Sequence, residues 1–364
     1  MNKAAAVTEI EKAIERYPRR PRNRHPEDIF GEDSGMDKPA LTLTDRFGRR
    51  IEYLRLSVTD RCDLRCTYCL PKGFKDFEEP EHWLTFDEIE RLLGAFARVG
   101  VNRIRLTGGE PLLRRNLPEL AARLHRLPGI RDISLSTNAT QLSKYAGALK
   151  NAGVARINVS LDSLKRERFA RIAGRDCLDR VIAGLMAAKE AGFTPIKINM
   201  VALSGVNDDE IDDMVEFCMA HGFVLRLIET MPMGVTGRNA AYFDLQPVKR
   251  RLQEKFDLVE GVVPGGGPAR YLQTPDGKFS VGFITPISQH FCATCNRVRL
   301  VVDGTLFMCL GQNEKFEFRP LLRAGARDAD LETAIRTAIE LKPERHEFHE
   351  TPQKIVRFMS ATGG

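Results

Sequence analysis

The feature that most restricts the fold of this chain is a regular alternation of strand-like and helix-like segments that begins at residue 51. Six apolar or alternating runs have the length and composition of strands: YLRLSVT (53–59), RIRLTGG (103–109), DISLSTN (132–138), RINVSLD (156–162), IKINMVA (196–202) and VLRLIET (224–230). Strands separated by helices indicate a parallel sheet. The pattern therefore predicts an α/β fold, an incomplete TIM-like (βα)6 barrel.

Two of the intervening helices carry the pattern of a capping box. Thr85 stands three positions before Glu88, and Asn207 stands three positions before Glu210. In a capping box each of the two side chains satisfies a backbone N–H group of the other residue. We therefore predict that one helix begins just after Thr85 and another just after Asn207.

Polar side chains alternate with apolar ones along nearly every predicted strand. Strands buried in a parallel sheet are normally apolar on both faces, and a closed eight-stranded barrel fills its lumen with branched apolar side chains. The polar face here comprises Arg55, Ser57, Arg103, Arg105, Ser134, Ser136, Asn138, Asn158, Ser160, Asp162, Lys197, Asn199 and Arg226. Since the apolar face must pack under the helices, we expect the polar face to line a wide, wet lumen.

Basic residues outnumber acids on this polar face. Arg55, Arg105, Lys197 and Arg226 would be buried there, and an unpaired buried cation costs several kcal/mol. A polyphosphate ligand would supply the missing negative charge and suits the guanidinium group well. The alternative is that these cations form ion pairs with acids on the same face.

Clustered cysteines indicate metal rather than disulfides in a chain of this kind. Cys62, Cys66 and Cys69 form one cluster, and Cys292, Cys295 and Cys309 form a second. The remaining two cysteines lie in helical patterns, where a buried free thiol is usual. No apolar run approaches the length of a membrane span, and the first residues lack the features of a signal peptide, so we expect a cytoplasmic protein.

The first cluster has three thiolates in the pattern C-x-x-x-C-x-x-C, directly after the first strand. Soft thiolate ligands select zinc, Cu(I) or iron–sulfur clusters. Three thiolates can hold a [4Fe–4S] cluster and leave its fourth iron open, and an open position is typical of a catalytic metal site. A zinc site with a distant fourth ligand is the structural alternative.

This C-x-x-x-C-x-x-C pattern, with Tyr68 before its last cysteine, resembles the signature of the radical S-adenosylmethionine superfamily. LTGGEPLLR (106–114) resembles the superfamily's GGE motif, and NVSLDS (158–163) resembles its polar fourth-strand segment. The resemblance implies that Cys62, Cys66 and Cys69 bind a cluster and that Glu110 accepts a hydrogen bond from the ammonium group of S-adenosylmethionine. It further implies S-adenosylmethionine contacts from Tyr68, Gly109, Ser160 and Met231.

The second cluster, C-x-x-C-x13-C, resembles one subfamily, the GTP 3′,8-cyclases of molybdenum cofactor biosynthesis. A zinc site completed by His290 is the alternative. The resemblance implies a second [4Fe–4S] cluster on Cys292, Cys295 and Cys309, GTP as substrate, and a Gly-Gly tail that reaches the active site. It implies catalytic roles for Arg55, Arg105 and Arg226 and a substrate site composed of Arg55, Arg105, Ser136, Lys197, Arg226, Arg297, Val298 and Arg299.

The resemblance covers residues 40 to 364 and has two departures, because Ala139 stands where glycine is common and Ser136 where threonine is usual. We predict a partly disordered extension (1–40), a partial barrel (41–234) and a C-terminal domain with the second cluster (235–364). The expected partners are an electron donor, a second copy of the chain, and the next enzyme of the pathway, cyclic pyranopterin monophosphate synthase. Another radical enzyme with an auxiliary cluster, or a zinc-binding protein without catalysis, is the alternative.

The charge distribution gives little support to a nucleic-acid partner. The net charge of +6 is small for 55 basic and 49 acidic residues. The densest basic run, Arg19 to Arg24, lies in a proline-rich segment beside acidic residues and resembles a solvated arm. We expect neither a nucleic acid nor a membrane as partner.

Overall fold

The computed structural model describes residues 42–363, and the strands of this part of the chain form one twelve-stranded sheet. Its order is β12-β11-β10-β1-β2-β3-β4-β5-β6-β9-β8-β7. The six central strands are β1 (Tyr53–Ser57), β2 (Arg103–Thr107), β3 (Asp132–Thr137), β4 (Arg156–Ser160), β5 (Ile196–Val201) and β6 (Val224–Ile228). Each lies within one of the six segments predicted as strands, so that prediction is confirmed.

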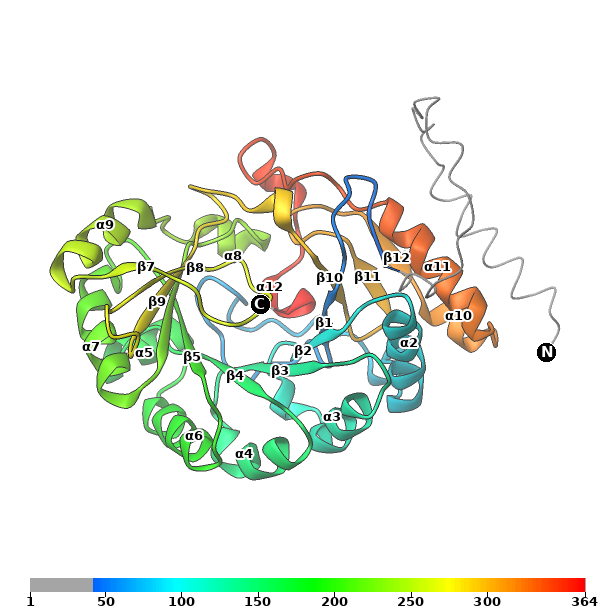
Figure 1. Cartoon of the computed structure of the whole chain (residues 1–364), viewed down its shortest axis with the longest axis horizontal. Coiled ribbons are helices and arrows are strands. Elements are labelled where there is room, and N and C mark those ends of the chain that lie inside the picture. Colours follow the sequence, from blue (N-terminus) through cyan, green and yellow to red (C-terminus); the bar gives the residue numbers. More distant parts are fainter. Residues whose placement is uncertain (1–41, 364) are drawn as a thin grey trace, which may run out of the picture.

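The six central strands are parallel to one another, and helices cover their outer side (Figure 1). These helices are α2 (Phe86–Arg98), α3 (Leu117–His125), α4 (Leu142–Asn151), α5 (Arg166–Ala173), α6 (Leu178–Glu190) and α7 (Ile211–His221). Short 3-10 turns, η1 (Pro80–His82), η2 (Pro111–Leu113) and η3 (Asp208–Glu210), occur in the connections. The sheet curls into a barrel that stays open, because β7 and β12 are its two edges.

The C-terminal part of the chain extends the sheet at both ends. Strand β9 (Ser280–Ile284) pairs with β6, and β10 (Arg297–Leu300) pairs with β1, both in parallel. The antiparallel strands β7 (Val259–Gly261) and β8 (Arg270–Gln273) follow on one side, and β11 (Thr305–Phe307) and β12 (Lys315–Glu317) on the other. The last part of the chain thus flanks the barrel and lies against its first and last strands.

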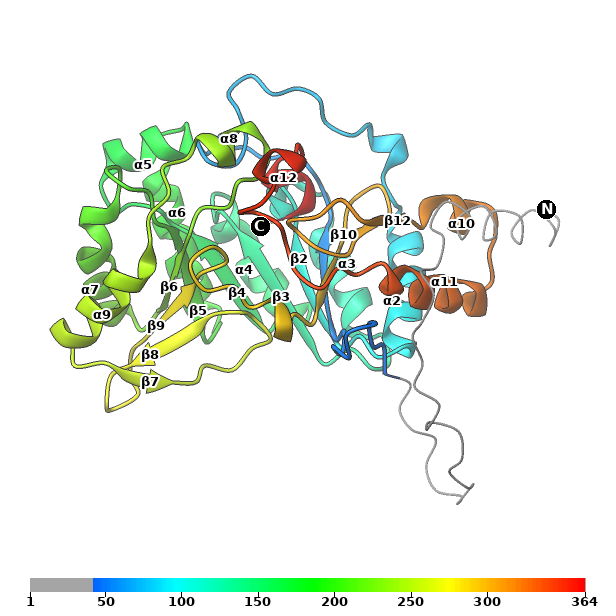
Figure 2. The same ribbon diagram turned by 90° about the horizontal axis from the view of Figure 1, so that it is seen from above.

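The helices and short turns of this C-terminal part complete the molecule. They are α8 (Gly234–Asn239), α9 (Leu245–Lys255), η4 (Cys292–Thr294), α10 (Arg319–Arg323), α11 (Asp328–Glu340), η5 (Pro352–Lys354) and α12 (Met359–Thr362). Figure 2 shows α8 and α12 at the same end of the barrel as the loop that follows β1. The boundary predicted at residue 234 stays a prediction, and the extension before residue 41 lies outside the described residues.

The alternation along the strands separates two environments. The apolar residues, among them Leu54, Leu56, Ile104, Leu106, Ile133 and Leu135, are at most 1% exposed and belong to the hydrophobic core under the helices. Many of the polar residues line two cavities on the inner side of the sheet, namely Arg105, Ser136, Asn138, Asn158, Ser160, Asp162, Lys197, Asn199 and Arg226. A polar lumen is therefore present, as predicted. In the described part of the chain, no helix is both long and apolar enough to span a membrane.

One of the two predicted capping boxes forms and the other does not. Thr85 accepts from the Glu88 N–H at 3.2 Å, and Glu88 accepts from the Thr85 N–H at 2.8 Å, so α2 begins as expected. The helical turn η3 begins just after Asn207, as predicted, but the predicted box is wrong, because the Asn207 side chain makes no capping bond and contacts the ends of β4 and β5 instead. Burial beside two strand ends offered Asn207 better partners than the helix did.

A pair of buried phenylalanines joins the C-terminal part to the barrel. Phe96 of α2 and Phe318, just before α10, are both fully buried, with ring centroids 5.8 Å apart in an edge-to-face arrangement. Close to them, Arg91 and Arg98 of α2 form ion pairs with Asp328 of α11. The C-terminal part is therefore packed against the barrel as one hydrophobic core.

We expect Phe318→Ala to lower the free energy of unfolding by about 3–5 kcal/mol, because it leaves a cavity in this shared core. Urea unfolding followed both by fluorescence and by far-UV circular dichroism should give one coincident transition. Val356→Ala, at a position 74% exposed, should change the stability by less than about 0.5 kcal/mol. A separate, early transition of the C-terminal part alone would contradict the single core.

Candidate active site

The first three cysteines lie in the loop after β1 and share one cavity. Cys62, Cys66 and Cys69 line a space of about 180 Å³ at the carboxyl ends of the strands. The loop is fixed to α5, because the Arg65 and Thr67 N–H groups donate to the last carbonyls of that helix at 2.9 and 3.0 Å. Burial raises the pKa of Cys62 and of Cys69 to about 12. The loop therefore presents three half-buried thiols to one cavity.

The residues predicted to contact S-adenosylmethionine lie around the same space. Tyr68, Gly109, Ser160 and Met231 all line the cavity of the three cysteines, together with Ser136. The structure thus brings these four residues together from four different segments; Glu110, for which a contact was also predicted, does not line the cavity. Their contacts with the cofactor stay a prediction.

The two glycines of the GGE motif are required by the loop that bears the cysteines. A Cβ on Gly109 would lie 2.3 Å from the Arg61 carbonyl oxygen, and one on Gly108, whose φ is +157°, would lie 2.4 Å from that of Thr59. These contacts are too close for any side chain. The glycines therefore set how near the end of β2 approaches the start of the cysteine loop.

Glu110 is engaged by the protein itself. Its carboxylate is fully buried and accepts from the Leu112 N–H (3.0 Å), the Thr137 hydroxyl (2.7 Å) and the Asn138 N–H (2.6 Å). Burial raises the pKa of Glu110 to about 7 despite these bonds. The sequence indicated a group waiting for a ligand, whereas in the structure Glu110 ties the end of β2 to the end of β3.

Asp162 holds Tyr68 in place between two cysteines. Its carboxylate accepts from the Tyr68 hydroxyl at 2.7 Å and from the Val201 N–H at 2.9 Å. Burial raises the pKa of Asp162 to about 6. Tyr68, Asp162 and Val201 belong to the cysteine loop, the end of β4 and the end of β5, so one carboxylate connects three parts of the cavity wall.

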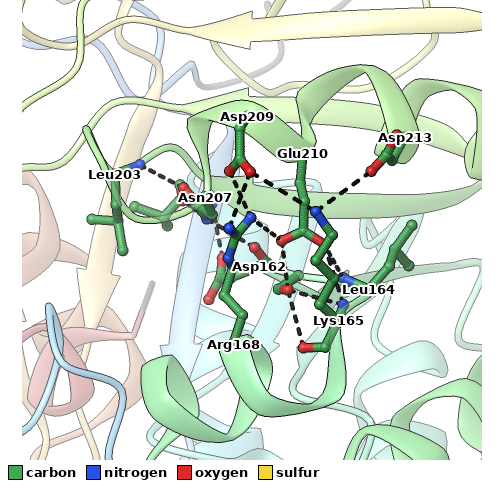
Figure 3. Close-up of polar contacts among 11 residues, drawn as sticks. Asp162, Leu164, Lys165, Arg168, Leu203, Asn207, Asp209, Glu210 and Asp213 are labelled. Carbon is green, nitrogen blue, oxygen red and sulfur yellow. Dashed lines mark hydrogen bonds and ion pairs between the residues drawn. The ribbon is translucent and has the colours of Figure 1, made fainter.

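A buried polar network behind Asp162 fixes these strand ends (Figure 3). Asn207 donates to the carbonyls of Asp162 (2.8 Å) and Val201 (2.9 Å) and accepts from the Leu203 N–H (2.8 Å). Beside it, fully buried Glu210 accepts from the Ser163 hydroxyl at 2.6 Å and forms an ion pair with Arg168 at 2.8 Å. The sequence indicated only a capping role for Asn207 and Glu210, since their partners come from distant strand ends.

A second cavity, of about 420 Å³, is lined by cations from β2, β4, β5 and β6. Arg105, Lys197 and Arg226 are each at most 7% exposed. Their hydrogen bonds go to neutral acceptors, namely Ser134 for Arg105, Asn158 for Arg226, and the Pro264 carbonyl for Lys197. None of the three has a carboxylate partner in the described part of the chain, so the cavity is prepared for an anion.

Three arginines stand at one level on neighbouring strands. Arg55 of β1 is in register with Arg299 of β10 on one side and with Arg105 of β2 on the other. Burial, followed by the charges of Arg299 and Arg105, holds the pKa of Arg55 well below its usual range. Its Nε atom is buried without a partner. Like charges directly opposite each other destabilise a sheet, and an anion bound between them would remove this cost.

The end of the chain enters the barrel, as the sequence implied for a Gly-Gly tail. The Gly363 carbonyl accepts from Arg299 at 2.8 Å, and a Cβ on Gly363 would lie 2.3 Å from Thr107 of β2. Both views place the end of the described chain inside the ring of strands (Figures 1 and 2). The tail therefore meets the arginine row at its β10 end.

The second set of cysteines surrounds the start of β10. Cys292 is in the short turn η4, Cys295 follows that turn, and Cys309 follows β11. Burial would raise the pKa of Cys295, but the charges of Lys342 and Arg297 outweigh it and lower the pKa to about 7. Since β10 pairs with β1, this set is held next to the strand that leads into the first cysteine loop.

Of the residues predicted for the substrate, Arg105, Lys197 and Arg226 line the larger cavity and Ser136 lines the cysteine cavity, whereas the side chain of Val298 lies on the outer face of its strand. Val298 is 1% exposed and lies in the hydrophobic core, at the level of Leu54. Arg297 and Arg299 point to the opposite face by the alternation of the strand. A contact of Val298 with substrate would have to come from its backbone.

Both cysteine sets fit iron–sulfur clusters by the chemistry of their donors. Each set gives three thiolates and no fourth protein ligand is needed for a [4Fe–4S] cluster with an open iron. Among the described residues, no group of three or more His, Cys, Asp or Glu side chains is arranged to hold a single metal ion.

Two family models match this chain and identify its protein class. Residues 56–218 match the family model described as "Radical SAM superfamily", and residues 223–348 match the one described as "Molybdenum Cofactor Synthesis C". A protein of Ectopseudomonas mendocina named GTP 3′,8-cyclase is 46% identical over 88% of this chain and 98% of its own length. Relatives of the same name from Paracoccus denitrificans and Rhizobium etli are 46% and 45% identical. The chain belongs to the radical S-adenosylmethionine superfamily and, within it, to the GTP 3′,8-cyclase family.

Solved structures support the fold. Streptococcus suis SuiB bound to S-adenosylmethionine has a TM-score of 0.59 and 16% identity, and the match covers 87% of this chain and 79% of SuiB. A second crystal structure of SuiB has a TM-score of 0.55 and 17% identity, and the match covers 73% of this chain and 62% of that protein. At this identity the likeness concerns the fold alone, and it agrees with the predicted incomplete barrel.

Binding of a polyanion in the larger cavity should weaken as the pH rises above about 7. Burial, followed by the charge of Arg226, lowers the pKa of Lys197 to about 7, so free Lys197 loses its charge above that pH. Since the anion favours the charged form, the affinity for inorganic triphosphate should fall by up to roughly tenfold per pH unit. Titration calorimetry between about pH 6 and 9 measures it.

Lys197→Met should remove most of this pH dependence. Lys249→Met is the matched control, because Lys249 lines the same cavity but its ammonium is held by Glu260 at 2.8 Å. The control should keep the pH profile of the unchanged protein. An affinity that is independent of pH in the unchanged protein would contradict the role of Lys197.

Asn207→Ala should lower the free energy of unfolding by about 3 kcal/mol, because it leaves two buried backbone groups and one half-buried carbonyl without their partner. Urea unfolding measures this change. Asn151→Ala, at the exposed end of α4, is the control and should cost less than about 0.5 kcal/mol. Equal stability of the two variants would mean that water replaces the Asn207 amide without cost.

Proposed function

We propose that this protein converts GTP to (8S)-3′,8-cyclo-7,8-dihydroguanosine 5′-triphosphate, the first step of molybdenum cofactor biosynthesis. The observation that carries the proposal is the row of Arg299, Arg55 and Arg105 across three neighbouring strands. It lies on the inner face of a barrel whose first loop presents three cysteines to one cavity. A nucleoside triphosphate is an anion of the required charge, and the family to which the chain belongs acts on GTP.

Two cysteine sets and one cavity would hold the cofactors. Cys62, Cys66 and Cys69 would hold one [4Fe–4S] cluster, Cys292, Cys295 and Cys309 would hold another, and Tyr68, Gly109, Ser160 and Met231 would contact S-adenosylmethionine. When bound, the first cluster, reduced by one electron, and S-adenosylmethionine would supply 5′-deoxyadenosyl radical chemistry with methionine as the leaving group; this chemistry would remove the 3′ hydrogen of GTP and allow a bond between C3′ and C8. The alternative of a zinc-binding protein without catalysis does not fit a radical S-adenosylmethionine family.

The chain's own residues bind and orient the substrate. Arg105, Lys197 and Arg226 would take the triphosphate in the larger cavity, while Arg55, Arg297 and Arg299 would hold the nucleotide near the second set of cysteines. Ser136, whose hydroxyl is buried without a partner, would donate to the substrate between them. These groups need no role in bond formation. Their contribution is to orient the substrate, and a misplacement of about one ångström can cost on the order of a hundredfold in rate.

The partial burial of the lumen cations and of the cysteine cavity also keeps water away from the reaction. The cations of the lumen are at most half-exposed and the cysteine cavity is enclosed by apolar side chains such as Leu64, Leu70 and Phe169. Exclusion of water strengthens each charge–charge contact and prevents side reactions of reactive species. The Gly363 carbonyl on Arg299 would position that guanidinium group for the substrate.

The proposal includes the setting of the enzyme. Reduced thiolates are kept in the cytoplasm, where we place the protein with an electron donor and with the synthase that receives its product. A homodimer is proposed from the family. We keep the division into a partial barrel (41–234) and a C-terminal cluster domain (235–364) as part of the proposal.

Anaerobic turnover tests the proposal. Reduced protein with both clusters reconstituted should release 5′-deoxyadenosine and a cyclised nucleotide from S-adenosylmethionine and GTP, but not from S-adenosylmethionine and ATP. Arg105→Met should lower kcat/KM for GTP by at least about a hundredfold, because it removes a buried cation from the substrate. Liquid chromatography with mass spectrometry measures both products.

Two controls separate the parts of the proposal. Arg131→Met, on an exposed arginine before β3, should leave kcat/KM within about twofold. Formation of 5′-deoxyadenosine without any change in GTP would mean that the radical chemistry is right and the substrate wrong. The absence of both products from iron-replete protein would overturn the radical reaction itself.

A further inference from the structure

The second set of cysteines lies within a frame of three cations, each from a different segment. Arg49 comes from the turn before β1, Lys342 from the residues after α11, and Arg357 from the tail before α12. Sequence patterns pointed to none of them. Lys342 in particular has the ordinary position of a basic residue near a helix end.

The two arginines hold the backbone of two cysteines. Arg49 donates to the Cys292 carbonyl at 3.0 Å and to the Glu344 carbonyl at 2.7 Å. Arg357 donates to the Cys309 carbonyl at 3.2 Å and to the Gln312 carbonyl at 2.7 Å. Each arginine therefore ties one cysteine to the segments around it.

Lys342 approaches a cysteine sulfur directly. Its side chain is 1% exposed, and its Nζ atom lies 3.6 Å from the Cys295 Sγ atom. The same ammonium donates to the carbonyls of Met308 (2.8 Å) and Arg297 (3.0 Å). In the described part of the chain it has no carboxylate partner. A buried ammonium without a counter-ion is costly, and a thiolate at this distance supplies the counter-charge.

No lysine or arginine side chain donates to a sulfur of the first set in the described part of the chain. Arg65 donates to the Cys62 carbonyl at 2.7 Å, but the sulfurs themselves receive weak donors, the Leu64 N–H at 3.4 Å and the Asn138 amide at 3.8 Å. Two buried carboxylates, Glu110 and Asp162, line or border the same cavity. The sulfurs of the two sets therefore have different charged neighbours, since an ammonium group lies beside Cys295 and carboxylates lie near the first set.

We propose that Lys342 is a positioning residue that holds the Cys295 thiolate and makes the second cluster easier to reduce than the first. Reduction adds one negative charge to a cluster, and a buried ammonium beside a ligand sulfur stabilises that charge. Near the first cluster the carboxylates act in the opposite direction. The inference rests on the proposed function for the presence of two clusters, and it is independent of the identity of the substrate.

The test compares reduction midpoint potentials in reconstituted full-length protein. Cys62→Ala/Cys66→Ala/Cys69→Ala keeps only the second cluster, and Cys292→Ala/Cys295→Ala/Cys309→Ala keeps only the first. Each is titrated with dithionite, which supplies one electron per cluster, and followed by electron paramagnetic resonance. The second cluster should have the more positive potential. A more negative potential of the second cluster would overturn the inference.

Variants of Lys342 are then measured in the chain that keeps only the second cluster. Lys342→Met should shift the midpoint potential to a more negative value, whereas Lys342→Arg, which keeps the charge, should stay close to the unchanged protein. Lys255→Met is the control, because Lys255 pairs with Asp212 on the surface. An unchanged potential in iron-replete Lys342→Met would overturn the role of Lys342.

Iron content decides the remaining outcomes. Loss of iron from Lys342→Met but not from Lys342→Arg supports the role of the charge in holding the cluster, and equal loss from both overturns it in favour of a purely structural role. If the chain that keeps Cys292, Cys295 and Cys309 never takes up iron, the two-cluster part of the proposed function fails. If both potentials are as expected while GTP is not consumed, only the substrate assignment fails.

Discussion

Repulsion between neighbouring arginines on the inner face of the sheet is the constraint on which the rest of this structure depends. Arg299, Arg55 and Arg105 face each other across three strands, with no carboxylate among the described residues to balance them. The large apolar core on the other face of the same strands offsets the unfavourable free energy of this repulsion. The centre of the sheet therefore carries positive charge that no carboxylate balances. The cavity beside it has the size and lining to bind a polyanion.

The order of the strands in the sheet places both cysteine sets close to this row of arginines. The first follows β1, and the second surrounds β10, which pairs with β1 although the two strands are more than two hundred residues apart. The tail completes the arrangement, since its Gly363 carbonyl binds Arg299. Both cysteine sets and the arginine row therefore lie on or beside one pair of neighbouring strands, and only the second set has an ammonium group beside a sulfur.

Local patterns in the sequence were reliable where the partners of a residue are also local. The six strands, the polar lumen and the capping box of Thr85 and Glu88 are present as predicted. The same reasoning was wrong for Asn207, whose partners are strand ends brought in from elsewhere. It also missed Arg49, Lys342 and Arg357, because nothing in their own neighbourhood distinguishes them from surface charges.

The sequence by itself determined the fold class, the two thiolate sets and the excess of buried positive charge, since these follow from spacing and from the period of two along a strand. Only the tertiary structure decided which polar groups lack a hydrogen-bond partner within the protein. The Glu110 carboxylate accepts hydrogen bonds from Leu112, Thr137 and Asn138, whereas Arg55 has an unpaired Nε atom. The physical reason is that a buried polar group must be satisfied by whatever the fold brings within about 3 Å of it, and that distance is set by contacts between segments that are remote in the chain.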